Sequence, residues 1–414
     1  MTRWILLIAI LGSIARADDT WPQFRGPGGQ GHALGTNLPL TFGEDEHVTW
    51  KTALPGEGWS SPVSDGRTLW MTTAVEQADS QVSLRALGVD VASGKLIANV
   101  EVLPPVAAIP KNSKNSHASP SPVLEAGRLY MHFGTYGSAC LDTATGKVVW
   151  TRTDLHLEHK EGPGSSPLLY GDLMIFNCDG MDVQFVVALD KRTGNVVWKT
   201  KRTGELSPNP DFCKAYATPL VIHADGRDQL ISPGAWQVVS YEPATGKEIW
   251  KVWYTPGFSN VPRPLFGNGL LYVCTGFGKP QLWAIKPEGT GDITETAVVW
   301  KLPKQAPANP SPILVGDTIF MVADKGVATC VDALTGEVIW TERLAGNFSA
   351  SPIFVDGRLY FSCEDGTVYV IAPEREFKLL ATNHLDGRLM ASPAVLHNAM
   401  FFRSDTALYR IEQK

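Results

Sequence analysis

A nine-residue phrase recurs along the chain and constrains its fold more than any other feature. Residues 142–150 read DTATGKVVW and residues 190–198 read DKRTGNVVW. The same pattern of an acidic residue, a Thr-Gly pair and a Trp returns at residues 242–250 and 332–340. Such a period is typical of chains built from supersecondary units that are too small to bury their apolar residues alone.

A second landmark precedes the phrase in each unit. It is a proline that comes directly after Ser or, in two units, after Thr or Arg. An apolar run, a turn and a second apolar run come after the proline. The landmark occurs eight times, 40 to 60 residues apart, at Pro62, Pro122, Pro167, Pro219, Pro264, Pro312, Pro352 and Pro393. We therefore count eight units.

One unit, residues 119–150, shows what each repeat builds. Residues 122–125 and 129–133 are apolar and rich in β-branched and aromatic side chains, and an Ala-Gly turn separates them. Residues 138–142 and 147–150 form a second pair around the Thr-Gly turn, where glycine tolerates a positive φ. Each unit is therefore predicted to be a sheet of four short antiparallel strands.

Sheets with apolar residues on both faces must stack on one another, and radial stacking predicts an all-β, eight-bladed β-propeller over residues 46–414. The last unit has only three strands, whereas residues 47–54, HVTWKTAL, form a strand with no unit before it. We expect this N-terminal strand to complete the last blade and to remove the exposed sheet edges. Residues 18–45 form a separate N-terminal segment.

The tryptophans of the phrase fall on the last strand of their blades, where we expect them to pack against the next blade. Blade 1 has Ala98 at this position, and the seventh unit lacks both the Thr-Gly pair and the Trp. The six tryptophans are Trp50, Trp150, Trp198, Trp250, Trp300 and Trp340.

Residues 1–17 have the pattern of a secretory signal: Arg3, a short apolar stretch and the Ala-Arg-Ala site at residues 15–17. Cleavage there would change the formal charge from −6 to −8. No later stretch is apolar enough to span a membrane, and the acidic balance disfavours nucleic acid. We expect an exported, soluble, monomeric protein in the periplasm or outside the cell.

The six cysteines are interpreted as buried free thiols, because several end similar apolar runs in different units. Cys178 and Cys213 are the pair most able to form a disulfide. The full set is Cys140, Cys178, Cys213, Cys274, Cys330 and Cys363.

Residues 188–198, ALDKRTGNVVW, resemble the tryptophan-docking repeat of the pyrroloquinoline-quinone (PQQ) dehydrogenases and of their non-catalytic relatives, including BamB. Residues 21–31, WPQFRGPGGQG, are similar to the N-terminal segment of exported PQQ-like repeat proteins. The resemblance covers almost the whole chain after the signal and implies an eight-bladed propeller. It does not by itself imply an activity, because this repeat carries both enzymes and scaffolds.

The catalytic branch is expected to use adjacent cysteines, a calcium ion held by Glu, Asn and Asp and, commonly, a c-type haem. The chain has no Cys-Cys pair and no Cys-x-x-Cys-His, and no calcium set can be matched. The sequence therefore favours a binding or scaffold protein with no cofactor. Two alternatives stay open: an oxidoreductase that uses PQQ and calcium, and a glycan-acting enzyme with its site at the channel mouth, which a pair of acids facing the channel would favour.

The candidate ligand site is the channel mouth, where the loops that enter the innermost strands converge. The polar residues of these loops are Asn115, His117, Lys214, Tyr216 and Arg263. Lys214 and Arg263 would suit a carboxylate or sulfate, and Tyr216 could stack on a sugar ring. The expected ligand is a small polar or anionic molecule or a protein partner, and neither a catalytic nor a metal site is predicted.

Two short motifs have competing interpretations. Residues 178–184, CDGMDVQ, offer Asp179 and Asp182 as calcium ligands, but Asp-Gly is also an ordinary hairpin turn. His156 and His159 in HLEHK suggest zinc, but they lack the spacing of a helical motif and a third ligand. The turn and a solvated loop are the favoured interpretations.

Overall fold

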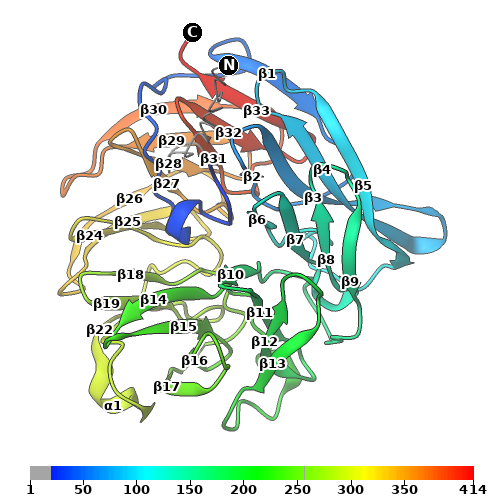
Figure 1. Cartoon of the computed structure of the whole chain (residues 1–414). Helices are drawn as coiled ribbons and strands as arrows, with labels where there is room; N and C mark the ends of the chain where they lie inside the picture. Colours follow the sequence, from blue (N-terminus) through cyan, green and yellow to red (C-terminus); the bar gives the residue numbers. More distant parts are fainter. Residues whose placement is uncertain (1–19, 256) are drawn as a thin grey trace, which may run out of the picture.

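Eight antiparallel sheets stand around a central axis in the computed structural model, which describes residues 20–255 and 257–414 (Figure 1). Seven sheets have four strands and one has a fifth, and the single α-helix of the described residues, α1 (Thr294–Ala297), is one turn long. The predicted eight-bladed propeller is thereby confirmed. The expected signal, residues 1–17, lies outside the described residues.

Each blade is a meander whose strands follow one another from the axis outwards. The strands of blades 1 to 4 are β2 (Val63–Ser64), β3 (Thr68–Glu76), β4 (Gln81–Asp90) and β5 (Leu96–Ala107); β6 (Val123–Glu125), β7 (Arg128–His132), β8 (Ser138–Asp142) and β9 (Val148–Arg152); β10 (Leu168–Tyr170), β11 (Leu173–Asp179), β12 (Gln184–Asp190) and β13 (Val196–Lys201); β14 (Leu220–Ala224), β15 (Arg227–Pro233), β16 (Gln237–Tyr241) and β17 (Glu248–Trp253).

Blades 5 to 8 continue the same order around the ring. Their strands are β18 (Leu265–Gly267), β19 (Leu270–Cys274), β20 (Leu282–Ile285) and β22 (Val298–Leu302); β23 (Ile313–Val315), β24 (Thr318–Val322), β25 (Val327–Asp332) and β26 (Val338–Arg343); β27 (Ile353–Val355), β28 (Arg358–Ser362), β29 (Thr367–Ile371) and β30 (Leu379–His384); β31 (Ala394–Leu396), β32 (Ala399–Arg403), β33 (Ala407–Glu412) and β1 (Val48–Ala53).

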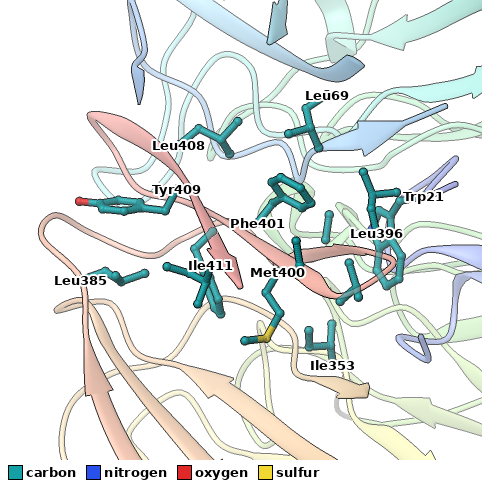
Figure 2. Packing of buried hydrophobic residues seen from close by; sticks show 14 of the residues in the cluster. Trp21, Leu69, Ile353, Leu385, Leu396, Met400, Phe401, Leu408, Tyr409 and Ile411 are labelled. Carbon is teal, nitrogen blue, oxygen red and sulfur yellow. The ribbon is translucent and has the colours of Figure 1, made fainter. Parts of the chain in front are cut away.

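The ring is closed by the N-terminal strand, as the sequence predicts. Strand β1 pairs with β33 in antiparallel register, with Ala53 opposite Ala407 and Trp50 opposite Arg410. The blade is packed on both faces, and its buried residues join blade 7, blade 1 and Trp21 in one apolar cluster (Figure 2). Because β1 and β33 come from opposite ends of the chain, this pairing joins the two ends of the repeat array.

The tryptophans lie between blades, as expected. The Trp198 indole N–H donates to the carbonyl of Pro243 in the next blade (3.1 Å), and a Cβ added to Gly246 would lie 2.4 Å from the indole. Only a glycine therefore lets the ring lie flat on the turn. Equivalent indole hydrogen bonds join Trp50 to Val91, Trp150 to Lys191, and Trp300 to Ala333.

Blades 5 and 7 replace this contact, because neither has the Thr-Gly pair at the spacing of the nine-residue phrase. In blade 5 an insertion brings β21 (Gly291–Asp292) parallel to β17, and Trp250 donates instead to Gln229 Oε1 of its own blade (2.7 Å). In blade 7 the Trp340 ring meets Phe377 edge-on at 5.2 Å and its N–H donates to the Glu374 carbonyl. The interfaces thus remain aromatic where the phrase is lost.

Residues 20–43, here called the strap, run over one face of the ring (Figure 1). The strap hydrogen-bonds to the innermost strands of five blades. These bonds join Trp21 to Ser64 of blade 1, Pro22 to Leu124 of blade 2, Gln30 to Phe266 of blade 5, His32 to Leu314 of blade 6, and Gly31 to Phe354 of blade 7. One segment therefore ties together strands that lie up to about 300 residues away in the chain.

In the described part of the chain, no helix has the length and apolar character needed to cross a membrane.

Truncation of one interface tryptophan should be costly. Trp198→Ala should lower the free energy of unfolding by roughly 3 to 5 kcal/mol, because a large buried aromatic leaves a cavity that the turn cannot fill. Chemical denaturation measures the change. His156→Ala, at an exposed position, is the control and should be close to neutral, so equal losses in the two variants would contradict the interface role of Trp198.

Removal of the closing strand should open the ring. Deletion of residues 45–54 removes β1 and leaves β33 as an unpaired edge, so we expect aggregation or loss of cooperative unfolding. Size-exclusion chromatography and thermal unfolding test this. A soluble deletion variant with an unchanged melting temperature would show that closure is dispensable.

Candidate functional site

A cavity of about 730 Å³ occupies the centre of the ring and opens at the face opposite the strap. Phe24 of the strap lines it, and the remaining lining comes from the loops that enter the innermost strands and from the second-to-third strand loops of blades 5 and 6. Because Phe24 and its neighbours cover the other end, the channel is a blind well. Its volume is that of a small-molecule site.

A ring of hydroxyl groups surrounds the base of the well. The backbone N–H of the residue before the landmark proline donates to the hydroxyl of the equivalent residue in the next blade, at 2.8 to 3.0 Å. This bond is repeated six times, onto Ser121, Ser166, Thr218, Ser311, Ser351 and Ser392, all of which line the well. We call these residues the hydroxyl ring.

Aromatic side chains gather on one side of the mouth. The Phe258 ring lies 4.6 Å from that of Phe212 and 5.9 Å from that of Phe277, and all three line the well. Trp236 stacks behind Phe258 at 6.3 Å and has a φ of 65°, which is uncommon for a bulky residue. Phe277 is 60% exposed, so this aromatic rim, Phe212, Phe258 and Phe277, offers apolar surface to a ligand.

Lys214 and Tyr216 lie beside one carboxylate on the wall of the well. The Tyr216 hydroxyl donates to Glu161 Oε2, and Lys214 Nζ lies 3.6 Å from Glu161 Oε1 and 3.7 Å from Asp211 Oδ1. Burial, followed by the hydrogen bond to Glu161, raises the pKa of Tyr216. The lysine charge is therefore balanced within the protein, and the tyrosine stays protonated.

The other charged groups at the mouth are hydrogen-bonded or paired, and Lys325 donates to Asn347 Oδ1 (3.3 Å). Lys160 lies 2.6 Å from Asp211, whose pKa this hydrogen bond lowers. Lys114 lies 2.7 Å from Glu364. Asp324 accepts from the Ala308 N–H (2.7 Å) and from the Asn309 amide. The mouth is polar without a strong net charge.

Three of the five site residues predicted from the sequence line the well: Asn115, Lys214 and Tyr216. Asn115 is largely occupied, because its amide donates to the carbonyls of Glu161 (2.6 Å) and Pro163 (3.1 Å). It therefore holds the loop that presents Glu161.

His117 and Arg263 do not line the well. The His117 ring is buried against Tyr136, whose hydroxyl lies 2.9 Å from His117 Nδ1. The Arg263 guanidinium turns to the strap and donates to the Phe24 carbonyl (2.8 Å) and Gln23 Oε1 (3.2 Å). Both side chains are thus used inside the fold, and the expected direct ligand contact from Arg263 has no geometric basis.

A second arginine, Arg25, lies behind the floor. It follows Phe24, is fully buried, and none of its guanidinium nitrogens has a hydrogen-bond partner among the described residues. Burial lowers the pKa of Arg25 and of Arg263 to about 9, so both are cationic at neutral pH. The floor therefore carries positive charge that no carboxylate of residues 20–255 and 257–414 balances.

The two motifs with competing interpretations do not form metal sites. Asp179 makes a buried bidentate ion pair with Arg202, at 2.6 and 2.7 Å, and Asp182 accepts from the Glu158 N–H. The His159 Nε2 accepts from the Thr135 N–H (3.2 Å), beside the buried His132. No group of three His, Cys, Asp or Glu side chains in residues 20–255 and 257–414 is arranged to hold a metal.

All six cysteines are buried free thiols, and none lines the well. Burial raises the pKa of Cys140, of Cys330 and of Cys363 above the ordinary thiol value, which keeps them protonated. Cys178 and Cys213, the pair considered for a disulfide, are not bonded to each other.

Sequence reasoning missed the hydroxyl ring and the aromatic rim. The hydroxyl ring could have been predicted from a sequence pattern, because Ser or Thr precedes seven of the eight landmark prolines and only Arg263 departs from it. No sequence pattern predicts the aromatic rim. Phe212, Phe258 and Phe277 come from three unrelated loops that only the fold brings together.

The family model described as outer membrane protein assembly factor BamB matches residues 42–221, 182–310 and 291–389. A protein of that name from Shewanella oneidensis is 21% identical over 293 residues, which cover 66% of this chain and 69% of the relative. A tetrathionate hydrolase from Acidithiobacillus ferrooxidans is 23% identical over 57% of this chain, but the match spans only 50% of that relative.

Solved structures share the fold. BamB from Moraxella catarrhalis has a TM-score of 0.59 at 13% identity, over 88% of this chain and 99% of that chain. The quinohemoprotein alcohol dehydrogenase ADHIIG from Pseudomonas putida HK5 has a TM-score of 0.65 at 11% identity, over 96% and 81%. At these identities the likeness shows the propeller alone.

The buried histidines predict a loss of stability in acid. The pKa of His132 is lowered to about 3 by burial and by His159, whereas an unfolded chain protonates histidine near 6.5. Between these values only the unfolded state binds the proton, so stability is complete above pH 6.5 and falls as the pH decreases, by about 1.4 kcal/mol per pH unit. His132→Gln should lose roughly 2 kcal/mol less than the wild type between pH 6.5 and 4.5.

Denaturant unfolding at several pH values measures this difference. His156→Gln, at an exposed position, is the control and should follow the wild type. Parallel pH profiles for wild type and His132→Gln would contradict the assignment of this loss to His132.

Proposed function

The chain belongs to the family described as outer membrane protein assembly factor BamB, and on that premise we propose that it is an exported, non-catalytic binding protein whose site is the blind well. The observation that supports this proposal most directly is the architecture of the well. The strap covers one end, the open end presents an aromatic rim, and a ring of hydroxyl groups surrounds the base. Such a cavity can enclose a small molecule or a short segment of a partner.

The charged groups of the well support binding rather than turnover. Lys214 and Glu161 carry opposite charges that balance each other, and the Tyr216 hydroxyl donates to Glu161. The pKa of Asp211 is held below its ordinary value by Lys160, so this carboxyl group cannot serve as a proton donor near neutral pH. A glycan-acting enzyme is nevertheless the second candidate, because three carboxylates, Glu161, Asp211 and Asp324, line the well.

The residues of the well do not fit a quinone with calcium. The buried thiols lie away from it, and the carboxylates that line it are engaged by lysine, tyrosine, asparagine or backbone donors. Asp179, which the sequence offered as a calcium ligand, is committed to Arg202.

The name of one relative supports a binding or scaffold role outside the cytoplasm. One relative is named an outer membrane assembly factor, and we propose that this chain likewise acts outside the cytoplasm by binding. The proposal makes the mouth of the well, with Phe277 and Phe212 exposed, the surface that a ligand or partner meets.

A blocked well tests the binding site. We expect at least one compound in a panel of sugars, organic acids, amino acids and short peptides to raise the melting temperature of the wild type. Ala308→Trp, at the wall of the well, should abolish that rise, whereas Ala144→Trp, on an exposed turn, should retain it. Equal responses from both variants would place the binding site elsewhere.

Turnover assays test the non-catalytic assignment. The purified chain incubated with PQQ and Ca²⁺ should not reduce an electron-accepting dye with alcohols or sugars, and it should leave oligosaccharides uncleaved in chromatography. Dye reduction that depends on PQQ, or cleavage that Ala308→Trp abolishes, would replace this proposal by the corresponding enzyme.

A further inference from the structure

The hydroxyl groups of the hydroxyl ring can still donate hydrogen bonds to a ligand. Each of its six hydroxyl oxygens accepts one backbone N–H from the preceding blade. None of these six hydroxyls donates to an acceptor in the described part of the protein. Because a hydroxyl carries one donor and two lone pairs, each can still give its hydrogen to a ligand. The base of the well therefore presents donors from six of the eight blades to whatever enters it.

Positive charge lies directly behind these donors. Arg263 Nε donates to the carbonyl of Pro219, the residue after Thr218 of the hydroxyl ring (3.1 Å). A Cβ on Gly31 would lie 2.7 Å from Arg25 Nη2 and 3.1 Å from the carbonyl oxygen of Pro352, the residue after Ser351. The two guanidinium groups thus lie at the level of the hydroxyl ring, on the strap side.

These arginines differ from Arg202, which is equally buried. Arg202 has Asp179 as a bidentate partner at 2.6 and 2.7 Å. Among the described residues no carboxylate pairs with Arg25 or Arg263, and Arg25 lacks even a neutral acceptor. Buried charge of this kind favours a nearby anion, because the field is weakly screened away from water.

The mouth has the opposite character. Lys114, Lys160 and Lys214 are each paired with a carboxylate, and Lys325 donates to Asn347 Oδ1 (3.3 Å) next to Asp324 in the chain. Four lysines are thus matched by Glu161, Asp211, Asp324 and Glu364, so the mouth has no excess charge to hold an anion. Its binding surface is the aromatic rim, which suits the flat apolar face of a ring. The well therefore changes from a stacking surface at the mouth to a hydrogen-bond-donating, electropositive base.

We propose that the well binds an acidic sugar, with its carboxylate at the hydroxyl ring and its sugar ring against the aromatic rim. The proposal rests on the proposed function and specifies the ligand class. The hydroxyls of the ring donate to the carboxylate oxygens, and Arg25 and Arg263 supply compensating charge through the floor. The sugar hydroxyls meet the Asn and Ser groups of the wall.

Two matched disaccharides test the charge requirement. Digalacturonate and α-1,4-galactobiose share one skeleton and differ in whether C6 is a carboxylate or an alcohol. Titration calorimetry with the whole mature chain should give at least about tenfold tighter binding of digalacturonate. Sodium sulfate, as an anion without a sugar ring, should bind at least about tenfold more weakly than digalacturonate.

Variants at the base and at the mouth should separate the two contacts. Thr218→Val keeps the shape of the side chain but removes its hydroxyl, so it should reduce the preference for digalacturonate severalfold, and Thr218→Ser should restore it. Ser61→Ala is the matched control, because Ser61 has the same position in blade 1 without lining the well. Phe258→Ala should weaken both disaccharides by similar factors.

The outcomes distinguish this inference from the broader proposal. Equal affinity for the two disaccharides, or sulfate binding as tight as digalacturonate, would overturn the acidic-sugar assignment and leave a binding well in place. If neither disaccharide binds, but another compound of the panel still binds in the well, the acidic-sugar assignment is also overturned and the binding well is kept. If the melting curve shows that Thr218→Val folds, and the variant keeps the full preference for digalacturonate over galactobiose, the proposed role of the hydroxyl ring is wrong.

Discussion

The docking of one indole onto the turn of the next blade is the interaction on which this molecule depends. A blade with apolar residues on both faces is unstable alone, and a tryptophan on its outer strand buries a large area at low entropic cost. The Trp198 ring lies on Gly246 and donates to the Pro243 carbonyl, which fixes the distance and the rotation between two blades. This contact occurs at four interfaces and is replaced by other tryptophan contacts at blades 5 and 7, so it contributes to the spacing of the inner strands and to the width of the well.

The strap makes the two ends of the channel different. It hydrogen-bonds to the inner strands of five blades and places Phe24 across the axis, so only one end stays open. The strap also brings Arg25 into the interior without a hydrogen-bond partner among the described residues, which is a costly arrangement unless nearby groups or a ligand compensate it. The same segment thus seals the ring, forms the floor of the site and determines its charge.

Local pairing of charges changes what the well can recognise. A count of lysines in the loops favours an anion at the mouth, but Lys214 and Lys160 share Glu161 and Asp211 with each other. Among the described residues, the charge without a carboxylate partner lies deeper, in Arg25 and Arg263, beside hydroxyl groups that donate to no acceptor in that part of the chain. An anionic group would therefore bind at the base of the well, and the aromatic rim would contact the rest of the ligand and select its shape.

The sequence by itself determined the blades, because hydrophobic alternation and Thr-Gly turns act over a few residues. The strand expected at residues 138–142 is β8 with the same bounds, the strand expected at residues 147–150 is β9 with small shifts, and the closing strand at residues 47–54 is β1. Loop convergence was also foreseen, since Asn115, Lys214 and Tyr216 share the well. Only the tertiary structure decided where each polar side chain points. His117 turns to Tyr136 and Arg263 to the strap, because their partners lie in other parts of the chain, 239 residues away for Arg263 and Phe24, and no local pattern encodes such a contact.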